Sequence, residues 1–473
     1  MRGPEVADLA LLVPELILVS AALVLMLVAR RIRQGQVASV GTVIAALVAL
    51  FAVGQTLSWG TIQGFTGMLV LDGYSQFFKI LIAAVLVLTT LLSVGRRAGG
   101  GVPRGDYHVL LLLAAVGMML SVSAADLMPL YLALELMTIC SYVLVGIRVE
   151  RPTSNEAAIK YFLLGSFSSA LFLFGISLTY GLTGTTAYEG IASALHSRGL
   201  VSQPFLLIAI GLVVAGLAFK IAAVPFHAWA PDAYQGASAP VAAFLAAGSK
   251  AAGLAALGRI LLSAFGTEVG AFSTIVVALA GLSLLVGSIL ALSQTDMKRL
   301  LAYSSIAHAG YALLGLIAGT AAGASATMTY AFFYVFMTLG AFGVVIALGP
   351  RGEKLDGFAG LATQRPGTAA LMLLFLLSLT GFPPTAGFVA KFVVITSAVQ
   401  AGHIALAVLA VGCSVITAFV YMRVAVLMYM KSTVAPAPAR LPLAVTTALV
   451  VAAAVTLVGG VFPASLMVWA VSP

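Results

Sequence analysis

Residues 216–232, GLAFKIAAVPFHAWAPD, place a lysine and a histidine on either side of a proline at the end of a long apolar run. A lysine inside hydrocarbon costs roughly 3 kcal/mol or more, so a deep lysine indicates function. The alternative is a lysine near a helix end whose ammonium reaches back to water. Pro225 removes a helical hydrogen bond, which a bilayer tolerates only where protein or water satisfies the freed carbonyl. The stretch therefore predicts an interrupted membrane helix with Lys220 beside the interruption.

The composition is that of a polytopic membrane protein. Of 473 residues, 62% are apolar and only 8% are charged, whereas soluble domains carry about 25% charged residues. The net charge of +9 indicates basic cytoplasmic loops rather than a nucleic-acid surface. Cys140 and Cys413 lie in apolar stretches without any CxxC pair, so we interpret them as small buried side chains. Glu15 near the start of the first apolar run favours a retained helix over a cleaved signal peptide.

Apolar windows of bilayer-spanning length predict about fourteen transmembrane helices. Two of these windows contain prolines that interrupt the helix: Pro225 lies in window 204–229, and Pro383 and Pro384 lie in window 368–398. The windows are approximately 8–29, 37–57, 75–94, 107–123, 126–147, 157–180, 204–229, 238–264, 269–292, 299–318, 324–348, 368–398, 403–430 and 441–463.

The basic loop residues predict the orientation, because cytoplasmic loops carry an excess of lysine and arginine. With the N-terminus outside, the outer segments hold Arg2 and Arg198. The inner loops then hold Arg30, Arg31, Arg33, Arg96, Arg97, Arg104, Arg148, Arg151, Lys298, Arg299, Arg351, Lys354, Arg365, Lys431 and Arg440. An even number of helices returns the C-terminus to the outer side. No loop is long enough for a soluble nucleotide- or flavin-binding domain.

The remaining charges within the helices fall into two groups. Lys79, Arg259 and Arg423 lie near span ends, and we expect them to reach back to water. The deep group comprises Glu135, Lys220, Lys250 and Lys391. Lys160 lies about one turn into its helix and fits either group, and Asp232 is expected in a loop or a helix cap.

These deep groups suit proton handling better than other chemistry. They are not a metal site, because charged lysine offers no ligand and carboxylate or imidazole clusters are missing. No serine or cysteine is paired with a base in a hydrolytic motif. Burial disfavours the charged forms of both lysine and glutamate, and a nearby Glu135 would stabilise the charged form of Lys220. His308 fits relay and packing equally, whereas His227 could carry protons to or from the cytoplasm.

Five ordered motifs resemble the antiporter-like membrane subunits shared by respiratory complex I and the multisubunit cation/proton antiporters. They are LALELMTICSYVLVG, NEAAIKYFLLGSFSSALFLFG, FKIAAVPFHAWAPDAYQGASAPVAAFLAAGSKAAG, QTDMKRLLAYSSIAHAGY and LSLTGFPPTAGFVAKF. The resemblance covers about residues 105–430. It implies two inverted five-helix repeats, residues 105–265 and 266–431, each with a broken helix. Residues 1–104 then supply helices 1–3, and residues 432–473 supply helix 14.

The resemblance also implies roles for individual residues. Glu135 and Lys220 match the family's Glu–Lys pair, Lys250 its connecting lysine and His308 its polar-axis histidine. Lys391 matches the terminal ionisable residue of the second broken helix. Lys160 lies in EAAIKYF, as in the family member nearest the quinone site. The lysine at 391, where the middle subunit would have glutamate, and the short chain, without the distal subunit's lateral helix, favour that member.

The expected function is therefore proton translocation within an NADH:quinone oxidoreductase. This chain would hold no cofactor, and NADH, FMN, iron–sulfur clusters and quinone would belong to partner subunits in the same complex. The expected location is the bacterial inner membrane, with both termini on the periplasmic side. A subunit of a stand-alone cation/proton antiporter is the alternative, and a scaffold without pumping activity is a third interpretation.

Overall fold

The computed structural model describes residues 6–29, 35–94, 105–198, 204–266, 269–432 and 441–464. These residues form α-helices throughout, apart from short 3-10 and π turns and one two-stranded hairpin. The elements are α1 (Val6–Ala10), α2 (Val13–Ala29), α3 (Gly35–Thr56), β1 (Ile62–Gly64), β2 (Leu69–Leu71), α4 (Gly73–Ser93), α5 (Gly105–Ser123), α6 (Leu127–Val145), α7 (Pro152–Thr183), α8 (Tyr188–Arg198), α9 (Pro204–Ile221), α10 (Trp229–Gly236), α11 (Ala239–Phe244), η2 (Leu245–Ser249), α12 (Lys250–Ser263), α13 (Val269–Leu292), α14 (Met297–Leu313), α15 (Ala321–Leu348), η4 (Gly349–Glu353), η5 (Leu355–Phe358), α16 (Leu361–Gln364), α17 (Pro366–Thr380), α18 (Ala386–Gln400), α19 (Ile404–Met430) and α20 (Leu443–Val461).

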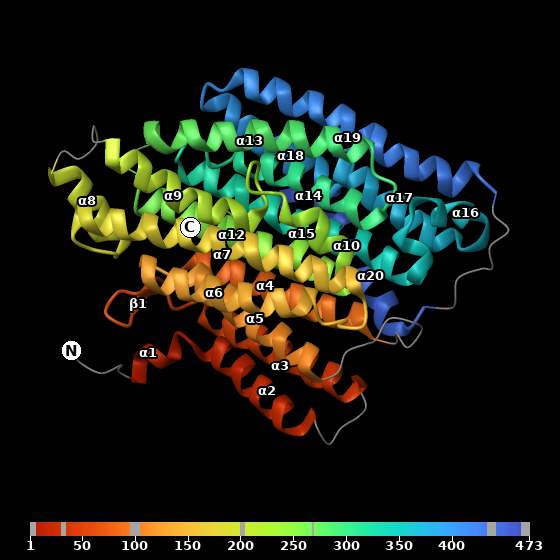
Figure 1. The fold of residues 1–473 in the computed structure, drawn as a ribbon, viewed down its shortest axis with the longest axis horizontal. Helices are drawn as coiled ribbons and strands as arrows, with labels where there is room; N and C mark the ends of the chain where they lie inside the picture. Colours follow the sequence, from red (N-terminus) through yellow and green to blue (C-terminus); the bar gives the residue numbers. More distant parts are fainter. Residues whose placement is uncertain are drawn as a thin grey trace.

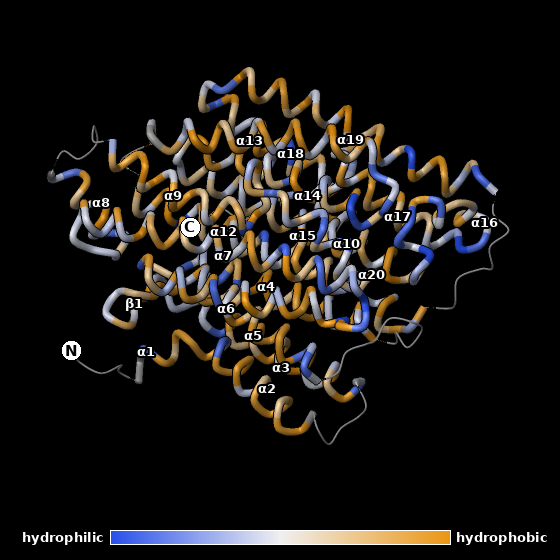
Figure 2. The backbone as a smooth tube through the Cα atoms, in the orientation of Figure 1, coloured by the Kyte–Doolittle hydropathy of each residue, from blue (hydrophilic) through white to orange (hydrophobic). Residues whose placement is uncertain are grey.

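The helices form one bundle in which most neighbours run side by side (Figure 1). Helices α1–α3 form one edge of the bundle, and α13 and α19 lie at the opposite edge. Helix α15 and the continuous α11–η2–α12 segment lie in the interior and are buried along nearly their whole length. Hydrophobic residues dominate the helices, and hydrophilic residues gather near α10, α16 and α17 (Figure 2). The fold class predicted from the sequence, an all-α polytopic membrane protein, is confirmed.

Each predicted apolar window coincides with a helix or an interrupted helix. Among the described residues, 11 helices are long and apolar enough to cross a membrane, and three apolar helices are shorter. The total of about fourteen crossings, the repeat boundaries and the inverted symmetry stay predictions. Both predicted interruptions are present, between α9 and α10 and between α17 and α18.

Helix boundaries differ from the apolar windows where a helix leaves the apolar layer. Helix α7 begins at Pro152, not near residue 157, because proline suits the first turn and the polar residues after it continue the helix into solvent. The first window is divided by a turn at Leu11 and Leu12. The hairpin and α8 were not predicted, because apolar windows report only membrane crossing.

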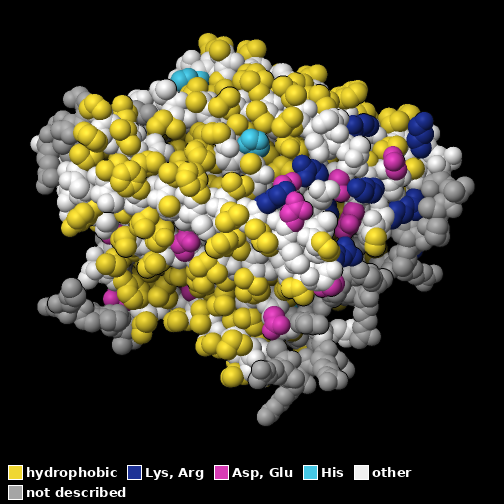
Figure 3. All heavy atoms as spheres, in the orientation of Figure 1, with side chains coloured by type: hydrophobic (Ala, Val, Ile, Leu, Met, Phe, Trp, Pro, Cys, Tyr) yellow, Lys and Arg dark blue, Asp and Glu magenta, His cyan; other side chains and the backbone are white. Residues whose placement is uncertain are grey.

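The Lys and Arg side chains visible on one face gather at one end of the bundle, whereas hydrophobic side chains cover much of the remainder (Figure 3). We call this the basic end. It includes Arg148, Lys298, Arg299, Lys354 and Lys431. Some of the residues used to predict the orientation lie outside the described part of the chain. These are the eight residues Arg2, Arg30, Arg31, Arg33, Arg96, Arg97, Arg104 and Arg440, together with the side chain of Arg198.

Three cations expected to reach for water are bound by protein instead. Lys79 is buried 2.8 Å from the carboxylate of Glu15. Arg259 donates two 2.8 Å hydrogen bonds to Asp72. Half-buried Arg423 donates to two main-chain carbonyls, one at the last residue of α13 and one in the loop that follows it. The prediction was wrong because each partner comes from another helix, which the position of a lysine or arginine within its own helix does not reveal.

Candidate functional site

Glu135 of α6 and Lys220 of α9 face each other. The Nζ atom of Lys220 lies 3.8 Å from Oε1 of Glu135 and donates a 2.6 Å hydrogen bond to the hydroxyl of Thr138. The hydroxyl of Ser169 on α7 donates to the same carboxylate. Three helices therefore hold one carboxylate and one ammonium next to each other, as the sequence predicted for this pair.

The two charges are not equally deep, contrary to the prediction. Lys220 is only 3% exposed, but Glu135 is 24% exposed. The glutamate adjoins an outward face of α6 that also bears exposed Leu132 and Ile139. Apolar composition around a residue does not reveal which face of its helix is covered, and this explains the difference.

The interruption beside Lys220 extends over residues 222–228 rather than over one proline. The indole of Trp229 donates a 2.9 Å hydrogen bond to the carbonyl of Phe219, which links the two half-helices. The main-chain amide of Val224 donates to the hydroxyl of Ser283 on α13 at 2.9 Å. Side chains from other elements thus satisfy main-chain groups that the interruption leaves without helical partners.

Lys250 is the first residue of α12 and directly follows the π-helical turn η2. Such turns are rare in proteins as a whole, and those that do occur are frequently found at functional sites. The buried ammonium donates to the main-chain carbonyl and, at 2.9 Å, to the hydroxyl of Ser305 on α14. Gly253, one turn later, lies against α9, since a Cβ there would stand 3.3 Å from Cβ of Lys220. Close packing of α9 and α12 therefore brings the two lysines onto adjacent helices.

Helix α14 continues the polar row from Lys250. Ser305, His308 and Tyr311 recur every three residues and are all buried. The Nδ1 atom of His308 lies 2.6 Å from the hydroxyl of Tyr330 on α15. The hydroxyl of Tyr311 lies 2.6 Å from that of Ser414 on α19. These hydroxyl-bearing surroundings of His308 are compatible with both the relay role and the packing role.

Lys391 lies at the far end of this row. Its ammonium donates to the carbonyl of Thr380, the last residue of α17, at 2.8 Å and to Ser414 at 3.1 Å. It also lies 4.2 Å from the ring centroid of Tyr311, within cation–π distance. The row from Lys250 thus reaches Lys391 through side chains of α14 and α19.

Two glycines lie close to Lys391, and they have different neighbours. At Gly387 the carbonyl of Ser378 occupies the position that a Cβ would take, so this glycine allows α17 and α18 to approach closely. Gly381 has φ +89°, and a Cβ there would stand 2.8 Å from Cδ of Lys391. Gly381 therefore provides both the left-handed turn after α17 and the space for the lysine side chain.

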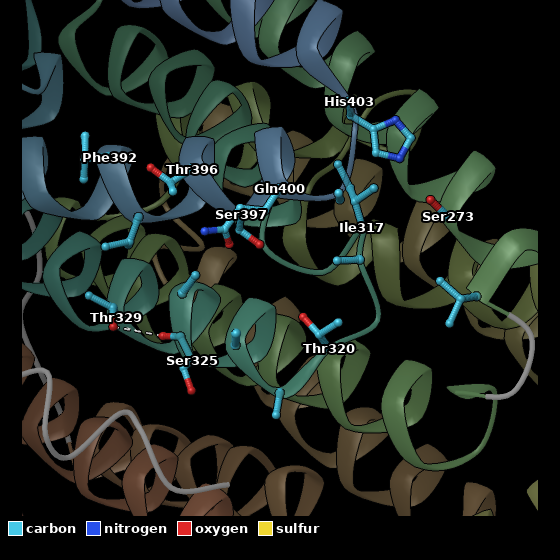
Figure 4. A pocket seen from close by; sticks show the side chains of 17 residues that line it. Ser273, Ile317, Thr320, Ser325, Thr329, Phe392, Thr396, Ser397, Gln400 and His403 are labelled. Atoms are coloured by element: carbon cyan, nitrogen blue, oxygen red, sulfur yellow. Dashed lines mark hydrogen bonds between the residues drawn. The ribbon is translucent and has the colours of Figure 1, made fainter.

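A cavity of about 960 Å³ lies between α15 and α18, at the end of the bundle opposite the basic end (Figure 4). Phe392, the residue after Lys391, lines one of its sides. Neutral hydrogen-bonding side chains line it together with apolar ones such as Val269, Ile317 and Val393: Ser273, Thr320, Ser325, Thr329, Thr396, Ser397 and Gln400. These hydrogen-bonding groups are the places at which water can bind in an otherwise largely apolar cavity.

Lys160 and His227 lie apart from the row. Lys160 is 48% exposed and pairs with Glu156 at 2.7 Å and with Asp232 at 3.1 Å. Asp232 is in the first turn of α10, not in a loop, and also accepts from Arg299. His227 is half-buried within the interruption itself. Lys160, which by its place in the sequence fitted either group of charges, thus belongs to an ionic network at the basic end and not to the deep group.

Sequence reasoning missed two buried cations at the basic end. Arg148 and Lys298 had been assigned to inner loops, but both are buried and donate to main-chain carbonyls at the end of α10. Their place next to loop residues gave no signal of burial. A positive charge close to a helix C-terminus was the available signal, but the helix concerned is distant in sequence.

The bundle, its two interrupted helices and its row of buried lysines define an antiporter-like membrane subunit. The sequence pattern of the NADH:quinone oxidoreductase/Mrp antiporter transmembrane family matches residues 124–417. NADH-quinone oxidoreductase subunit N 2 of Rhizobium meliloti is 45% identical over 457 residues, which cover 96% of this chain and 95% of the relative. Subunit N of Desulfovibrio desulfuricans is 44% identical over 496 residues, which cover 98% and 97%. The chain therefore belongs to this family, in its group of NADH-quinone oxidoreductase subunits N.

Solved structures share the fold. A chain of respiratory complex I from Thermus thermophilus with bound aureothin superposes with a TM-score of 0.84 at 34% identity, covering 97% of this chain and 100% of that one. A chain of the Mrp complex from Dietzia sp. DQ12-45-1b has a TM-score of 0.85 at 22% identity, covering 98% and 96%. The second similarity concerns the fold alone.

Proposed function

We propose that the chain is a proton-translocating membrane subunit of an NADH:quinone oxidoreductase. The observation that carries the proposal is the row of buried lysines, because ionisable groups in a membrane interior are costly and mark ion or proton pathways. The names of the most similar relatives support the enzyme. Electron transfer from NADH through FMN and iron–sulfur clusters to quinone would then take place in partner subunits, and this chain would use the released energy.

In the proposed relay, Glu135 and Lys220 act as a switch. While the carboxylate is close, it stabilises the ammonium of Lys220, and its neutralisation or displacement favours proton release. Lys250 would receive the proton across the α9–α12 contact. The hydroxyls and imidazole of α14 would then conduct it towards Lys391, with water completing the path where no direct hydrogen bond is present.

Uptake and release are proposed at opposite ends of the bundle. The interruption at residues 222–228, with His227 in it, leads into α10, whose C-terminal end lies at the basic end, and the positive-inside rule assigns that end to the cytoplasm. Lys391 lies near the hydroxyl-lined cavity at the other end, so we assign it the exit side. This orientation puts both termini on the periplasmic side of a bacterial inner membrane.

A subunit of a stand-alone cation/proton antiporter is the second candidate, because the Mrp structure has the same fold. The two candidates differ in their partners. Purification of the chain from its native membrane should recover flavin- and iron–sulfur-containing subunits if it belongs to an oxidoreductase. Recovery of a complex without either cofactor would instead support the antiporter.

Lys220→Met tests the relay in the purified complex reconstituted into vesicles. We expect fewer protons pumped per NADH oxidised, because methionine keeps the length of the side chain but holds no proton. Lys354→Gln, a change at a lysine that is 67% exposed, serves as the control and should leave the ratio unchanged. Normal pumping by the Lys220→Met complex would contradict the relay and support a scaffold.

A further inference from the structure

Half-helix α10, which follows the interruption, is bound at its C-terminal end by two buried cations. The ammonium of Lys298 donates to the carbonyls of Gln235 and Ala237 at 2.6 and 3.0 Å. The guanidinium of Arg148 donates to the carbonyl of Gly236 at 2.8 Å. Three successive carbonyls at the negative end of the helix are thus satisfied by positive charges from other elements.

The side of α10 is bound by two further cations. Arg299 donates from Nη1 to the Asp232 carboxylate at 2.6 Å and to the side-chain oxygen of Gln235 at 3.0 Å. Lys160 of α7 donates to the other oxygen of Asp232 at 3.1 Å. Asp232 therefore connects α10 to α7 and to α14 at the same time.

Two of the four cations come from the first turn of α14. The N-cap residue of that helix, Asp296, accepts from the main-chain amides of Lys298 and Arg299, and the Gln235 side-chain amide donates to it at 3.3 Å. Farther along, α14 carries Ser305, the partner of Lys250, and His308. The half-helix next to Lys220 and the helix of the second predicted repeat that continues the polar row thus share one ionic network.

Helix α10 depends on these contacts for its position. It has eight residues, and isolated helices shorter than about 12–15 residues are marginal in water. Across the interruption, the side-chain hydrogen bond that links it to α9 comes from Trp229. Buried Trp229 and Tyr234 pack the apolar side of α10 against aromatic rings of other elements, and the cations hold its polar side and its C-terminal end.

We propose that Arg299 and Lys298 are positioning residues that join α10 and α14 into one unit and thereby fix the position of the interruption beside Lys220. Neither side chain contacts Lys220 or Lys250 in the structure, so they act on the relay through the position of α10. The inference rests on the proposed proton relay for its functional consequence, but its structural part can be tested separately.

Arg299→Gln in the intact complex tests both parts. Hydrogen–deuterium exchange should become faster in residues 229–237 and stay unchanged in residues 204–219, and fewer protons should be pumped per NADH. Arg299→Lys should recover part of both effects, because a lysine can reach one acceptor but does not bridge Asp232 and Gln235 as the guanidinium does. Lys354→Gln is the matched control: Lys354 lies 3.7 Å from Asp296 of the same network and has no contact with α10 in the structure.

Unchanged exchange in residues 229–237 of a normally assembled Arg299→Gln complex would overturn the inference. Faster exchange with normal pumping would also overturn it, because the contact would then be structural only. Asp232→Asn, which keeps the side-chain shape and removes its charge, gives the same two readouts if Arg299→Gln does not assemble. Failure of the relay itself would appear in Lys220→Met, whose exchange in residues 229–237 should resemble that of the unaltered complex.

Discussion

At the scale of single residues, the three deep lysines differ in what holds them. Lys220 has a carboxylate nearby, whereas Lys250 and Lys391 donate only to hydroxyl and main-chain oxygens. A carboxylate stabilises an ammonium more strongly than neutral oxygens do. Lys220 is therefore suited to hold a proton until Glu135 changes its charge or position, and the other two are suited to pass one on.

The first prediction concerns the coupling of Glu135 and Lys220. Glu135→Gln and Lys220→Ala should each reduce pumping, but the double variant should lose less than the sum, because each single change leaves one charge, buried Lys220 or partly exposed Glu135, without its partner. Residues in contact show coupling energies of about 0.5–3 kcal/mol, and the ratio of protons pumped per NADH in the four complexes measures this coupling. Glu156→Gln, at an exposed carboxylate, is the control. Fully additive losses would contradict the pairing.

The second prediction concerns Lys391. Lys391→Met should lower the number of protons pumped per NADH while the complex stays intact on a native gel, because the lysine side chain is buried inside this chain and donates to Thr380 and Ser414. Gly381→Ala should reduce pumping as well, since a Cβ at φ +89° would strain the turn and press on the lysine side chain. Gly412→Ala, at a helical glycine with open space around it, is the matched control.

Two results would contradict this assignment. Release of neighbouring subunits by Lys391→Met would mean that the lysine anchors a partner. Intact assembly with normal pumping would mean that it is neither an anchor nor a carrier.

At the scale of elements, one ion pair joins two of the N-terminal helices to each other, and a second joins them to the rest of the bundle. Lys79 of α4 pairs with Glu15 of α2, and Arg259 of α12 pairs with Asp72 at the N-cap of α4. Burial raises the pKa of Asp72, but the hydrogen bonds and charge of Arg259 outweigh it and hold that pKa below its usual value. The ionised form of Asp72 is therefore the one that stabilises the attachment of α4 to α12.

The third prediction concerns this attachment. Arg259→Met should destabilise the purified complex by about 3–5 kcal/mol, because Asp72 would remain largely buried without a partner. Arg259→Met combined with Asp72→Leu should recover most of the loss, since two apolar side chains leave no unpaired charge. Thermal unfolding of the complex measures both variants. Equal stability of the single and double variants would contradict the explanation.

The fourth prediction gives the pH dependence of the same pair. Because the folded pKa of Asp72 is depressed, its contribution is fully present above the unfolded pKa of about 3.9 and is lost as the pH falls through the lower folded value. When the pH is lowered from about 4, the Asp72→Asn complex should therefore lose less stability than the unaltered complex does. Thermal unfolding at each pH measures the difference. An identical acid profile in the variant would refute the role of Asp72.

At the scale of the whole molecule, the helices present an apolar surface and collect charge at one end. Large hydrophobic side chains such as Leu27, Phe167 and Val415 are more than half exposed, as contact with lipid or with partner subunits requires. On the face drawn in Figure 3, the visible Lys and Arg side chains lie at the basic end. This asymmetry supports the proposed orientation of the chain in the membrane.

The fifth prediction tests that orientation. A single cysteine at exposed Lys354, at the basic end, should react with a membrane-impermeant thiol reagent only from the cytoplasmic side. A cysteine at exposed Thr66, in the hairpin turn, should react only from the periplasmic side. The unaltered chain is the control, because Cys140 and Cys413 are buried. The reverse labelling pattern would contradict the orientation, and with it the assignment of uptake and exit sides.

The sequence alone determined the features that depend on local chemistry. The apolar windows predicted where helices occur, Pro225, Pro383 and Pro384 predicted where two of them are interrupted, and deep charges such as Lys220 identified the polar row. Each of these signals lies within one helix, because bilayer thickness, proline geometry and the cost of buried charge act on a short segment.

Only the tertiary structure decided which charges are paired and how deep they lie. Lys79, Arg259 and Arg423 are bound by protein rather than by water, Glu135 is partly exposed, and Lys298 is buried at the end of α10. Their side-chain contacts join residues far apart in the chain, from 34 positions for Glu135 and Ser169 to 187 positions for Arg259 and Asp72. Burial and charge pairing depend on the packing of separate helices, and neither helical periodicity nor local hydropathy contains that information.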